Sequence, residues 1–244
     1  VSINIVMVDN DSSDDSWERI NSFLDDLAFQ SSIEDTISLK FRYRPSAIKS
    51  SRSKKYKNFS IYAIRSADNR GYAAGNNFGI ELGTQLASDY FWILNNDTYV
   101  DPLSLKYLIE RVEAEPDAGI CGATIKNYDP PYEIQCMGGS RFSHLTGRGQ
   151  PVNILSNHQA VTNHIIESNV TYISGACMFV TRTFIESVGL MNEAYFLYCE
   201  ELDWVERMKL SSKLKLCVEQ RAVVFHKIGA SIGTAKSGAF GSPQ

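Results

Sequence analysis

Short apolar runs alternate along this chain with segments of helical periodicity, and this alternation constrains the fold more than any other feature of the sequence. Between the apolar runs, apolar residues recur at steps of three and four, as in Trp17, Ile20, Leu24 and Leu27, which is typical of an amphipathic helix. Strands that alternate with helices favour a largely parallel sheet with helices on its faces, so we predict an α/β protein. The predicted strands are 3–8, 60–65, 90–94, 119–125, 170–173, 176–180 and one or two within 214–225, and the predicted helices begin at Asp14 and span 76–86, 102–114, 182–188 and 200–210.

Length and charge exclude several classes of protein. A chain of 244 residues with 43% apolar residues fits one large domain or two small ones and can bury a substantial core. The formal net charge of -4 gives no reason to expect nucleic acid as a partner. No apolar run approaches the roughly 20 residues that span a bilayer.

Cysteine usage and the start of the chain bear on location. The five cysteines are odd in number and lack metal-ligand spacing, so we expect reduced thiols in a cytoplasmic protein, with the inner face of the membrane as the alternative. The opening run "SINIVMVDN" has no signal-peptide features and follows Val1 rather than Met, so we expect the natural protein to start upstream.

Two segments interrupt the alternation. Residues 126–169 are rich in Gly, Pro, Asn, Ser and His, and such a segment is functional, disordered or a misread set of short strands. Residues 40–57 contain eight Lys or Arg and no acid. This basic segment is either a solvated mobile loop or a patch for anionic lipid headgroups or a phosphate-bearing acceptor, which would give peripheral membrane contact.

Polar clusters follow three of the predicted strands. Asp9, Asn10 and Asp11 end the first strand, 68–71 (Asp-Asn-Arg-Gly) follow the second, and Asn95-Asn96-Asp97 follow the third. Ligands of open parallel sheets bind outside the carboxyl ends of the strands, and glycines let the backbone approach a ligand closely, so we predict a nucleotide site. For residues 11–13 a turn and helix N-cap is an equal alternative. The chain lacks the Gly-x-Gly-x-x-Gly spacing, a P-loop and a serine nucleophile elbow.

In order, these blocks resemble family 2 glycosyltransferases of the GT-A fold, in particular the rhamnosyltransferase-like branch. The matching blocks are "VDNDSSD" at 8–14, "NRGYAAGNNFG" at 69–79, "LNNDTYVDP" at 94–102, "SGACMFVTR" at 174–182, "GLMNEAYFLYCEELDWVER" at 189–207 and "VVFHKIGAS" at 223–231. The resemblance implies a Rossmann-like, mostly parallel sheet flanked by helices with a smaller acceptor-side subregion. It also implies that the first strand and helix of the family are absent from this chain.

The resemblance assigns the nucleotide and the metal to particular residues. It implies Mg²⁺ or Mn²⁺ held by Asp97 and His226, which would offset the charge of a leaving diphosphate. A lone His after an apolar strand is otherwise a satisfied core or edge residue. The implied nucleotide-binding residues are Asp9, Asn10, Asn69, Arg70, Gly71, Gly75, Asn76, Asn95 and Asn96.

The catalytic base is expected in the block at 189–207. A carboxylate must accept the proton of the acceptor hydroxyl, and Glu201 occupies the second position of the family's Glu-Asp pair, where Asp is usual. Glu200 and Asp203 are rival candidates, and acids in a first helical turn are also favoured by the helix dipole. Met191-Asn192 stands where the family usually has Phe-Asp, next to the expected acceptor contacts. The residues expected to face the acceptor or sugar are Ser174, Gly175, Glu193, Tyr198 and Trp204, with core packing as the alternative for Trp204.

The resemblance therefore predicts a metal-dependent, inverting glycosyltransferase. Its expected donor is a UDP- or dTDP-sugar such as dTDP-rhamnose, and its expected acceptor is a glycan or lipid-linked glycan in bacterial surface polysaccharide synthesis. We expect residues 1–125 to form the nucleotide-sugar-binding half and 126–244 the acceptor-binding and catalytic half. The alternatives are a sugar-nucleotide nucleotidyltransferase and a catalytically degenerate scaffold. Oligomeric state is left open.

Overall fold

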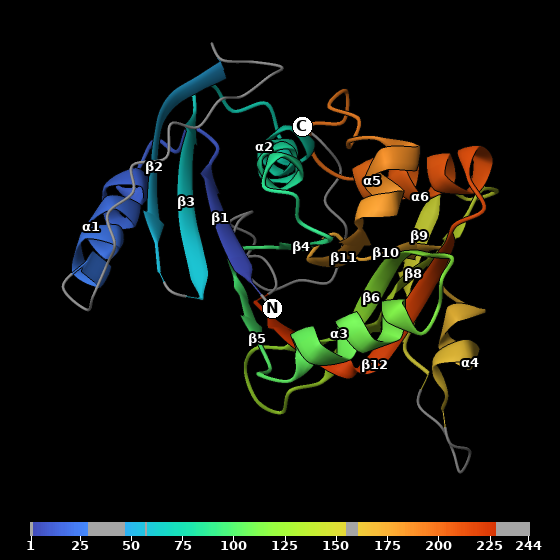
Figure 1. Cartoon of the computed structure of the whole chain (residues 1–244). Coiled ribbons are helices and arrows are strands. Elements are labelled where there is room, and N and C mark those ends of the chain that lie inside the picture. Colours follow the sequence, from blue (N-terminus) through green and yellow to red (C-terminus); the bar gives the residue numbers. More distant parts are fainter. Residues whose placement is uncertain (1, 29–46, 57, 155–160, 228–244) are drawn as a thin grey trace. The chain divides into compact units, whose positions relative to one another are not determined.

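A computed structural model of the chain describes residues 2–28, 47–56, 58–154 and 161–227. The chain divides into a first unit, residues 1–91 with 188–207, and a second unit, residues 92–187 with 208–244. The helices are α1 (Ser16–Ala28), α2 (Tyr72–Gln85), α3 (Ser104–Glu113), α4 (Asn163–Glu167), α5 (Arg182–Val188) and α6 (Glu200–Ser211). The strands are β1 (Ile3–Asp9), β2 (Ile48–Lys55), β3 (Phe59–Ser66), β4 (Tyr90–Leu94), β5 (Thr98–Val100), β6 (Ala118–Asn127), β7 (Ile134–Met137), β8 (Gly139–Ser143), β9 (Arg148–Pro151), β10 (Tyr172–Ile173), β11 (Cys177–Thr181) and β12 (Lys215–His226) (Figure 1).

The first unit is a three-stranded sheet with a helix on each face. The strand order is β1-β3-β2, with β1 parallel and β2 antiparallel to β3. Successive side chains of a strand point to opposite faces, and β3 uses both. Ile61 and Ala63 pack with Trp17 and Leu24 of α1. Tyr62 and Ile64 pack with Phe78 and Leu82 of α2 on the other face (Figure 1). Burial on both faces explains why residues 61–64 of β3 are an unbroken apolar run.

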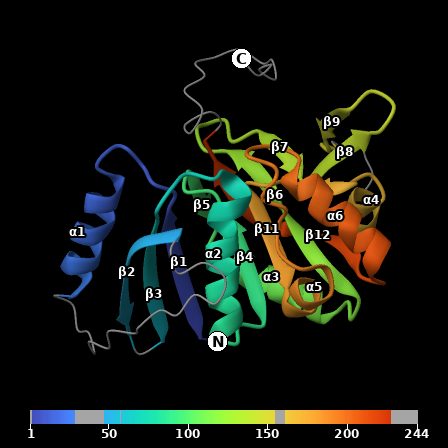
Figure 2. The same cartoon turned by 90° about the horizontal axis from the view of Figure 1, so that it is seen from above.

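The second unit is built on a six-stranded sheet of order β4-β11-β6-β12-β5, with β7 added at β6. β6 and β12 run parallel, whereas β11 and β7 are antiparallel to β6, and β5 is antiparallel to β12. α3 packs on β6 and β12 (Figure 2). A smaller antiparallel sheet has the order β10-β8-β9.

The predicted α/β class is confirmed, but both larger sheets are mixed rather than mostly parallel. The prediction failed because it missed β2, β5, β7, β8 and β9, and because β11, which was predicted, runs antiparallel to β6. Neighbours joined by short connections pair antiparallel and need no crossover helix. Within 126–169 the described residues therefore contain the short strands that were one of the three alternatives, together with α4.

The basic segment is a strand where the structure describes it. Residues 48–55 form β2, so the loop interpretation is wrong for them. Their basic side chains lie near acids: Arg52 Nη2 is 2.6 Å from Asp25 Oδ1, and Lys49 Nζ is 3.6 Å from Asp11 Oδ1. The basic residues at 40, 42, 44 and 57 lie outside the described residues.

The structure also bears on membranes and thiols. In the part of the chain that the structure describes, none of the helices combines the length and the apolar character needed to cross a bilayer. All five cysteines are free thiols in the structure, and four of them are buried.

Candidate functional site

Asp97 and His226 lie side by side in the second unit. β4 ends at Leu94, and the chain turns through 95–97, where the Thr98 hydroxyl donates to the Asn95 carbonyl oxygen at 2.7 Å. β5 then pairs with β12 in a register that sets Thr98 opposite His226. This register brings Asp97, the residue before Thr98, next to the imidazole ring of His226. His226 Nε2 lies 3.2 Å from Asp97 Oδ1.

This pair has the chemistry of a partial metal site. The Asp97 and His226 side chains are only 10% and 17% exposed, and Asp97 Oδ1 has no aligned hydrogen bond among the described residues. A carboxylate oxygen and an imidazole nitrogen are both suitable ligands for Mn²⁺, which takes its remaining ligands from water and substrate. No cluster of three or more His, Cys, Asp or Glu side chains that could hold a metal occurs in the described ranges. Among the residues that the structure describes, Asp97 and His226 thus fit an ion bound through two protein side chains.

Sequence reasoning missed a residue beside this pair. The Oε1 atom of Gln135, a residue of β7, lies 3.1 Å from His226 Nδ1. The Nε2 group of Gln135 donates to the His226 carbonyl oxygen at 2.8 Å. Gln135 falls in the segment without periodicity, and only the pairing of β7 with β6 brings it to the end of β12. No sequence signal marks it.

Several predicted nucleotide-binding residues come together in the first unit. Asn10 Nδ2 donates to Asn69 Oδ1 at 3.0 Å and to the Gly71 carbonyl oxygen at 2.9 Å. The Gly71 N–H donates to Asn69 Oδ1 at 3.0 Å. Gly75 lies within the first turns of α2, where an added Cβ would be 3.6 Å from the Asn10 side chain. The predicted start of the helix at 76–86 is corrected here, because α2 starts at Tyr72 rather than at Asn76.

Asp9 is almost completely buried at the end of β1. Its Oδ1 accepts a hydrogen bond from the Ser12 N–H at 3.1 Å, and Oδ2 lies 3.2 Å from Arg65 Nε without an aligned hydrogen bond. Asp9 thus holds the segment that follows β1 through the Ser12 N–H, which favours a structural role for Ser12 within residues 11–13. Asp9 belongs to the first unit and Asp97 to the second, and their convergence stays a prediction.

Arg70 and Asn76, also expected at the nucleotide, have local partners. Arg70 Nη1 lies 3.6 Å from Glu193 Oε2, and the Asn76 side chain donates to the Tyr72 carbonyl oxygen along its own helix. Glu193 in addition accepts from the buried Asn77 Nδ2 at 2.9 Å. Glu193 is therefore held against α2, and Asn77 is a structural residue that the prediction did not single out.

The candidate bases lie in the first turn of α6. Burial raises the pKa of Glu201 to about 7, and the charge of Glu200 adds to that shift. Burial also raises the pKa of Glu200. One carboxylate oxygen of each is buried without a hydrogen-bond partner in the described part of the chain.

Asp203 differs from both glutamates. Its Oδ2 accepts a hydrogen bond at 2.8 Å from Arg207 Nε, and Arg207 also donates to the carbonyl oxygens of Val188 and Leu190. This network closes the start of α6 onto the preceding loop, so Asp203 is already engaged. Of the three candidates, Glu201 and Glu200 have carboxyl groups without such a partner.

The predicted acceptor residues have different environments. Trp204 is fully buried and its Nε1 donates to the Gly189 carbonyl oxygen at 2.9 Å, which favours core packing over stacking on a sugar. Tyr198 is 53% exposed and has a positive φ of 71°. Ser174 and Gly175 lie between β10 and β11 in the second unit.

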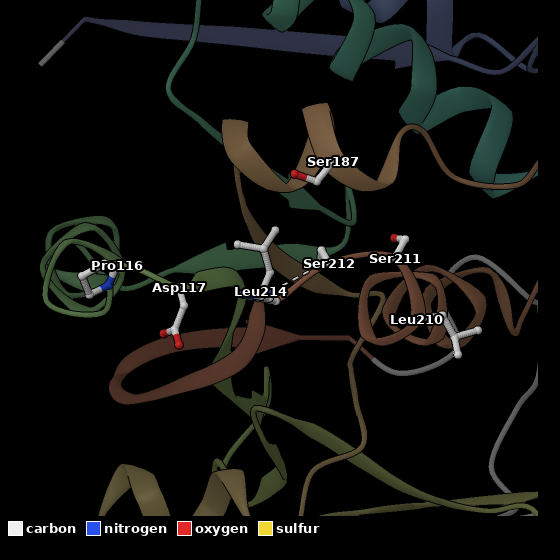
Figure 3. Close-up of a pocket in the computed structure, with 8 residues that line it drawn as sticks. Pro116, Asp117, Ser187, Leu210, Ser211, Ser212 and Leu214 are labelled. Carbon is white, nitrogen blue, oxygen red and sulfur yellow. Dashed lines mark hydrogen bonds between the residues drawn. The ribbon is translucent and has the colours of Figure 1, made fainter.

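A hollow of about 630 Å³ opens elsewhere in the second unit (Figure 3). It is lined by the end of α6 and the turn after it, residues 210–214, together with Pro116, Asp117 and Ser187. None of the residues predicted from the sequence lines it, and it lacks the paired oxygen and nitrogen ligands found at Asp97 and His226.

Comparison with known proteins gives a family and several curated relatives. Residues 46–189 match the family described as glycosyl transferase family 2. "Low-salt glycan biosynthesis hexosyltransferase Agl10" of Haloferax volcanii is 24% identical over 61% of this chain and 46% of its own length. "N-acetylglucosaminyl-diphospho-decaprenol L-rhamnosyltransferase" of Mycobacterium tuberculosis is 25% identical over 66% of this chain and 54% of its own length. The chain thus spans about half the length of the curated relatives it matches.

A solved structure shares the fold. The crystal structure of GalNAc-T7 with UDP, GalNAc and Mn²⁺ aligns with a TM-score of 0.58 over 92% of this chain and 37% of that chain, at 14% identity. Identity this low supports the fold alone.

Proposed function

The chain belongs to glycosyl transferase family 2, and from this premise we propose that it transfers a sugar from a nucleoside-diphosphate sugar to a glycan or lipid-linked acceptor. The named activities of the two curated relatives, a hexosyltransferase and a rhamnosyltransferase, support sugar transfer. The acceptor of the second relative is a diphospho-decaprenol, which supports a lipid-linked acceptor here. We propose a UDP- or dTDP-sugar as donor, with dTDP-rhamnose as the first candidate.

The burial of the Glu201 carboxyl group, which raises its pKa, is the observation that carries the proposed mechanism. A general base works best when its pKa lies near the working pH, and burial holds the pKa of Glu201 at about 7. In the proposed mechanism the free carboxylate oxygen of Glu201 accepts the proton of the acceptor hydroxyl. At the same time the oxygen of that hydroxyl attacks the anomeric carbon. One displacement of this kind inverts the configuration at the anomeric carbon. The diphosphate leaves on the opposite side.

Asp97 and His226 are the residues proposed to hold Mg²⁺ or Mn²⁺. When bound, such an ion supplies positive charge that offsets the charge developing on the leaving diphosphate. Asp97 contributes a carboxylate oxygen and His226 the Nε2 lone pair. Asn10, Asn69 and Gly71, which bond to one another in the first unit, are proposed to contact the nucleoside.

We further propose a cytoplasmic location, at the inner face of the membrane where lipid-linked acceptors are exposed. The five free thiols are compatible with a reducing compartment. The acceptor is a growing cell-surface glycan in this proposal.

The experiment that tests the proposal identifies the products. The protein is incubated with Mn²⁺, a panel of labelled UDP- and dTDP-sugars and a lipid-diphosphate acceptor. Sugar transfer releases a nucleoside diphosphate, whereas nucleotidyl transfer would release pyrophosphate. We expect Asp97→Ala to lower transfer at least about 100-fold through loss of one metal-ligand oxygen.

The control is Asp129→Ala, which removes an exposed carboxylate from a turn of the same unit. It should keep full activity, and both variants should melt within a few degrees of the wild type. Full transfer by Asp97→Ala would remove the metal role of Asp97. Release of pyrophosphate, or no turnover of any sugar nucleotide, would reject the proposed function.

A further inference from the structure

The side chain of Gln135 contacts His226 at both ends of its amide group. Nε2 donates to the backbone carbonyl oxygen of His226 at 2.8 Å and lies 3.4 Å from the carbonyl oxygen of Lys126. Oε1 lies 3.1 Å from His226 Nδ1. The strands set this arrangement, because β7 and β12 both pair with β6, and His226 lies opposite Asn127.

The two carbonyl oxygens fix which way the amide of Gln135 faces. A carbonyl oxygen only accepts hydrogen bonds, so the NH₂ group must be the end that faces His226 O and Lys126 O. The other end, Oε1, is then the atom opposite Nδ1. Since Oε1 cannot donate, a hydrogen bond across this contact requires the proton to sit on Nδ1.

The neutral ring then has its lone pair on Nε2, the ring nitrogen that lies beside the Asp97 carboxylate. Nε2 is 3.2 Å from Asp97 Oδ1, and that oxygen has no aligned hydrogen bond in the described part of the chain. Two acceptors at this distance repel one another unless a cation lies between them or the ring is protonated. A divalent ion satisfies both atoms at once.

We propose that Gln135 is a positioning residue that fixes His226 as the Nδ1–H tautomer, so that Nε2 and the Asp97 carboxylate are both free to accept a divalent cation. Without Gln135, the Nε2–H tautomer of His226 becomes available. Its Nε2–H then donates to Asp97 Oδ1, so that neither of these two atoms is free to bind a cation. Outer partners of metal-binding histidines commonly change metal affinity 10- to 100-fold when removed. This inference rests on the proposed function for the presence of a metal but assigns a role to Gln135, a residue that the family resemblance does not single out.

The test uses the full chain without any sugar nucleotide. The tautomer of His226 is measured in the metal-free protein by ¹⁵N–¹H correlation NMR of the imidazole nitrogens at pH 8. Only four histidines are present, and the His226 signals are identified by their loss in His226→Gln. Mn²⁺ alone is titrated in parallel, with electron paramagnetic resonance of free Mn²⁺ as the readout.

We expect the Nδ1–H form in the wild type. Gln135→Met, which keeps the length of the side chain but removes its polar atoms, should shift His226 towards Nε2–H and weaken Mn²⁺ binding about 10- to 100-fold. Gln135→Glu keeps an oxygen acceptor opposite Nδ1 and should keep the Nδ1–H signal. Gln150→Met, at an exposed glutamine of β9, is the matched control and should change neither readout.

Three results would overturn the inference. These are an Nε2–H wild type, an unchanged tautomer and Mn²⁺ affinity in Gln135→Met, and equal loss of the Nδ1–H signal in Gln135→Met and Gln135→Glu. The wild-type spectrum and Gln135→Glu decide the question even when Gln135→Met fails to fold. If the His226 tautomer and the Mn²⁺ affinity change as expected but the protein transfers no sugar, the result counts against the proposed function. The role of Gln135 is then unaffected.

Discussion

The carboxyl group of Glu201 lies in a buried environment, beside Glu200, that disfavours its ionised form. Burial is the larger cause and the neighbouring Glu200 the smaller one, and together they raise the pKa of Glu201 to about 7. A carboxyl group with this pKa changes charge near neutral pH, which suits a general base. The same residue therefore gives one expectation for rate and one for stability.

The first expectation concerns the pH dependence of transfer. Only the deprotonated carboxylate can accept a proton, so kcat/KM should rise with pH and level off above a midpoint near 7, the pKa of Glu201. Glu201→Gln should lower kcat by about 10²- to 10⁴-fold and abolish this midpoint. Glu186→Gln, an exposed glutamate of α5, is the control and should keep the profile. A rate independent of pH between about 5.5 and 8.5 would exclude Glu201 as the base.

The second expectation concerns the free energy of unfolding. The folded-state pKa of Glu201 lies above its ordinary value of 4.5, so the folded protein binds the proton more tightly than the unfolded chain. This contribution to stability is fully present below pH 4.5 and is lost as the pH rises through about 7. Thermal melting should therefore show Glu201→Gln gaining stability relative to the wild type between pH 5 and pH 8. An equal difference at both pH values would contradict the shift.

At the scale of elements, α2 is tied to the loop that precedes α6. Asn77 is 2% exposed, and its Nδ2 donates to the Met191 carbonyl oxygen at 3.0 Å and to Glu193 at 2.9 Å. Its Oδ1 accepts from the Met191 N–H at 3.0 Å. Beside it, Gly71 has a φ of 89°, and a Cβ there would collide with the Phe196 carbonyl oxygen at 2.1 Å. These contacts hold the loop that leads to the candidate base.

Removing the Asn77 amide should therefore destabilise the first unit. Asn77→Ala breaks three hydrogen bonds and leaves the Met191 backbone groups buried without partners, which should cost about 2–4 kcal/mol in the free energy of unfolding. Asn76→Ala is the matched control on the same helix. It loses a single hydrogen bond to the Tyr72 carbonyl oxygen and should cost about 1 kcal/mol or less. Urea denaturation followed by circular dichroism measures both, and equal losses would show that the tether contributes little.

At the scale of the whole molecule, neither unit is continuous in sequence. Residues 188–207 belong to the first unit, although residues 92–187 of the second unit precede them. β4 and α6 each contribute residues to both units. The halves 1–125 and 126–244 were predicted by function, as a nucleotide-sugar-binding half and an acceptor-binding half. The boundary between them does not coincide with the boundaries of the two compact units.

This connectivity predicts that the two halves do not fold separately. Fragment 1–125 lacks the segment that bonds to Asn77, and fragment 126–244 lacks β4, β5 and nearly all of β6 from its six-stranded sheet. Each loses buried apolar contacts that oppose the chain entropy of folding. We expect poorly dispersed amide NMR spectra for both fragments and a dispersed spectrum for the whole chain. A dispersed spectrum of either fragment alone would refute this expectation.

The sequence by itself determined the α/β class, the family and most long elements. β4 and α5 have the predicted bounds, and α1 buries Trp17 and Leu24 of the predicted apolar stripe. These features follow from local periodicity, which depends only on the geometry of a single helix or strand. The short strands and the start of α2 escaped prediction because pairing with distant strands and the backbone of Gly71 decide them.

Tertiary structure alone decided which polar residues meet. The sequence marked Asp97 and His226 through their motifs, but the register of β5 on β12 sets them 3.2 Å apart. No motif covers Gln135, and the block at 69–79 includes Asn77 without indicating its role, since they acquire their partners across 91 and more than 110 residues of chain, respectively. The pKa of Glu201 likewise depends on burial by packing. Hydrogen bonding and desolvation depend on distances in space, and only the folded chain sets those distances.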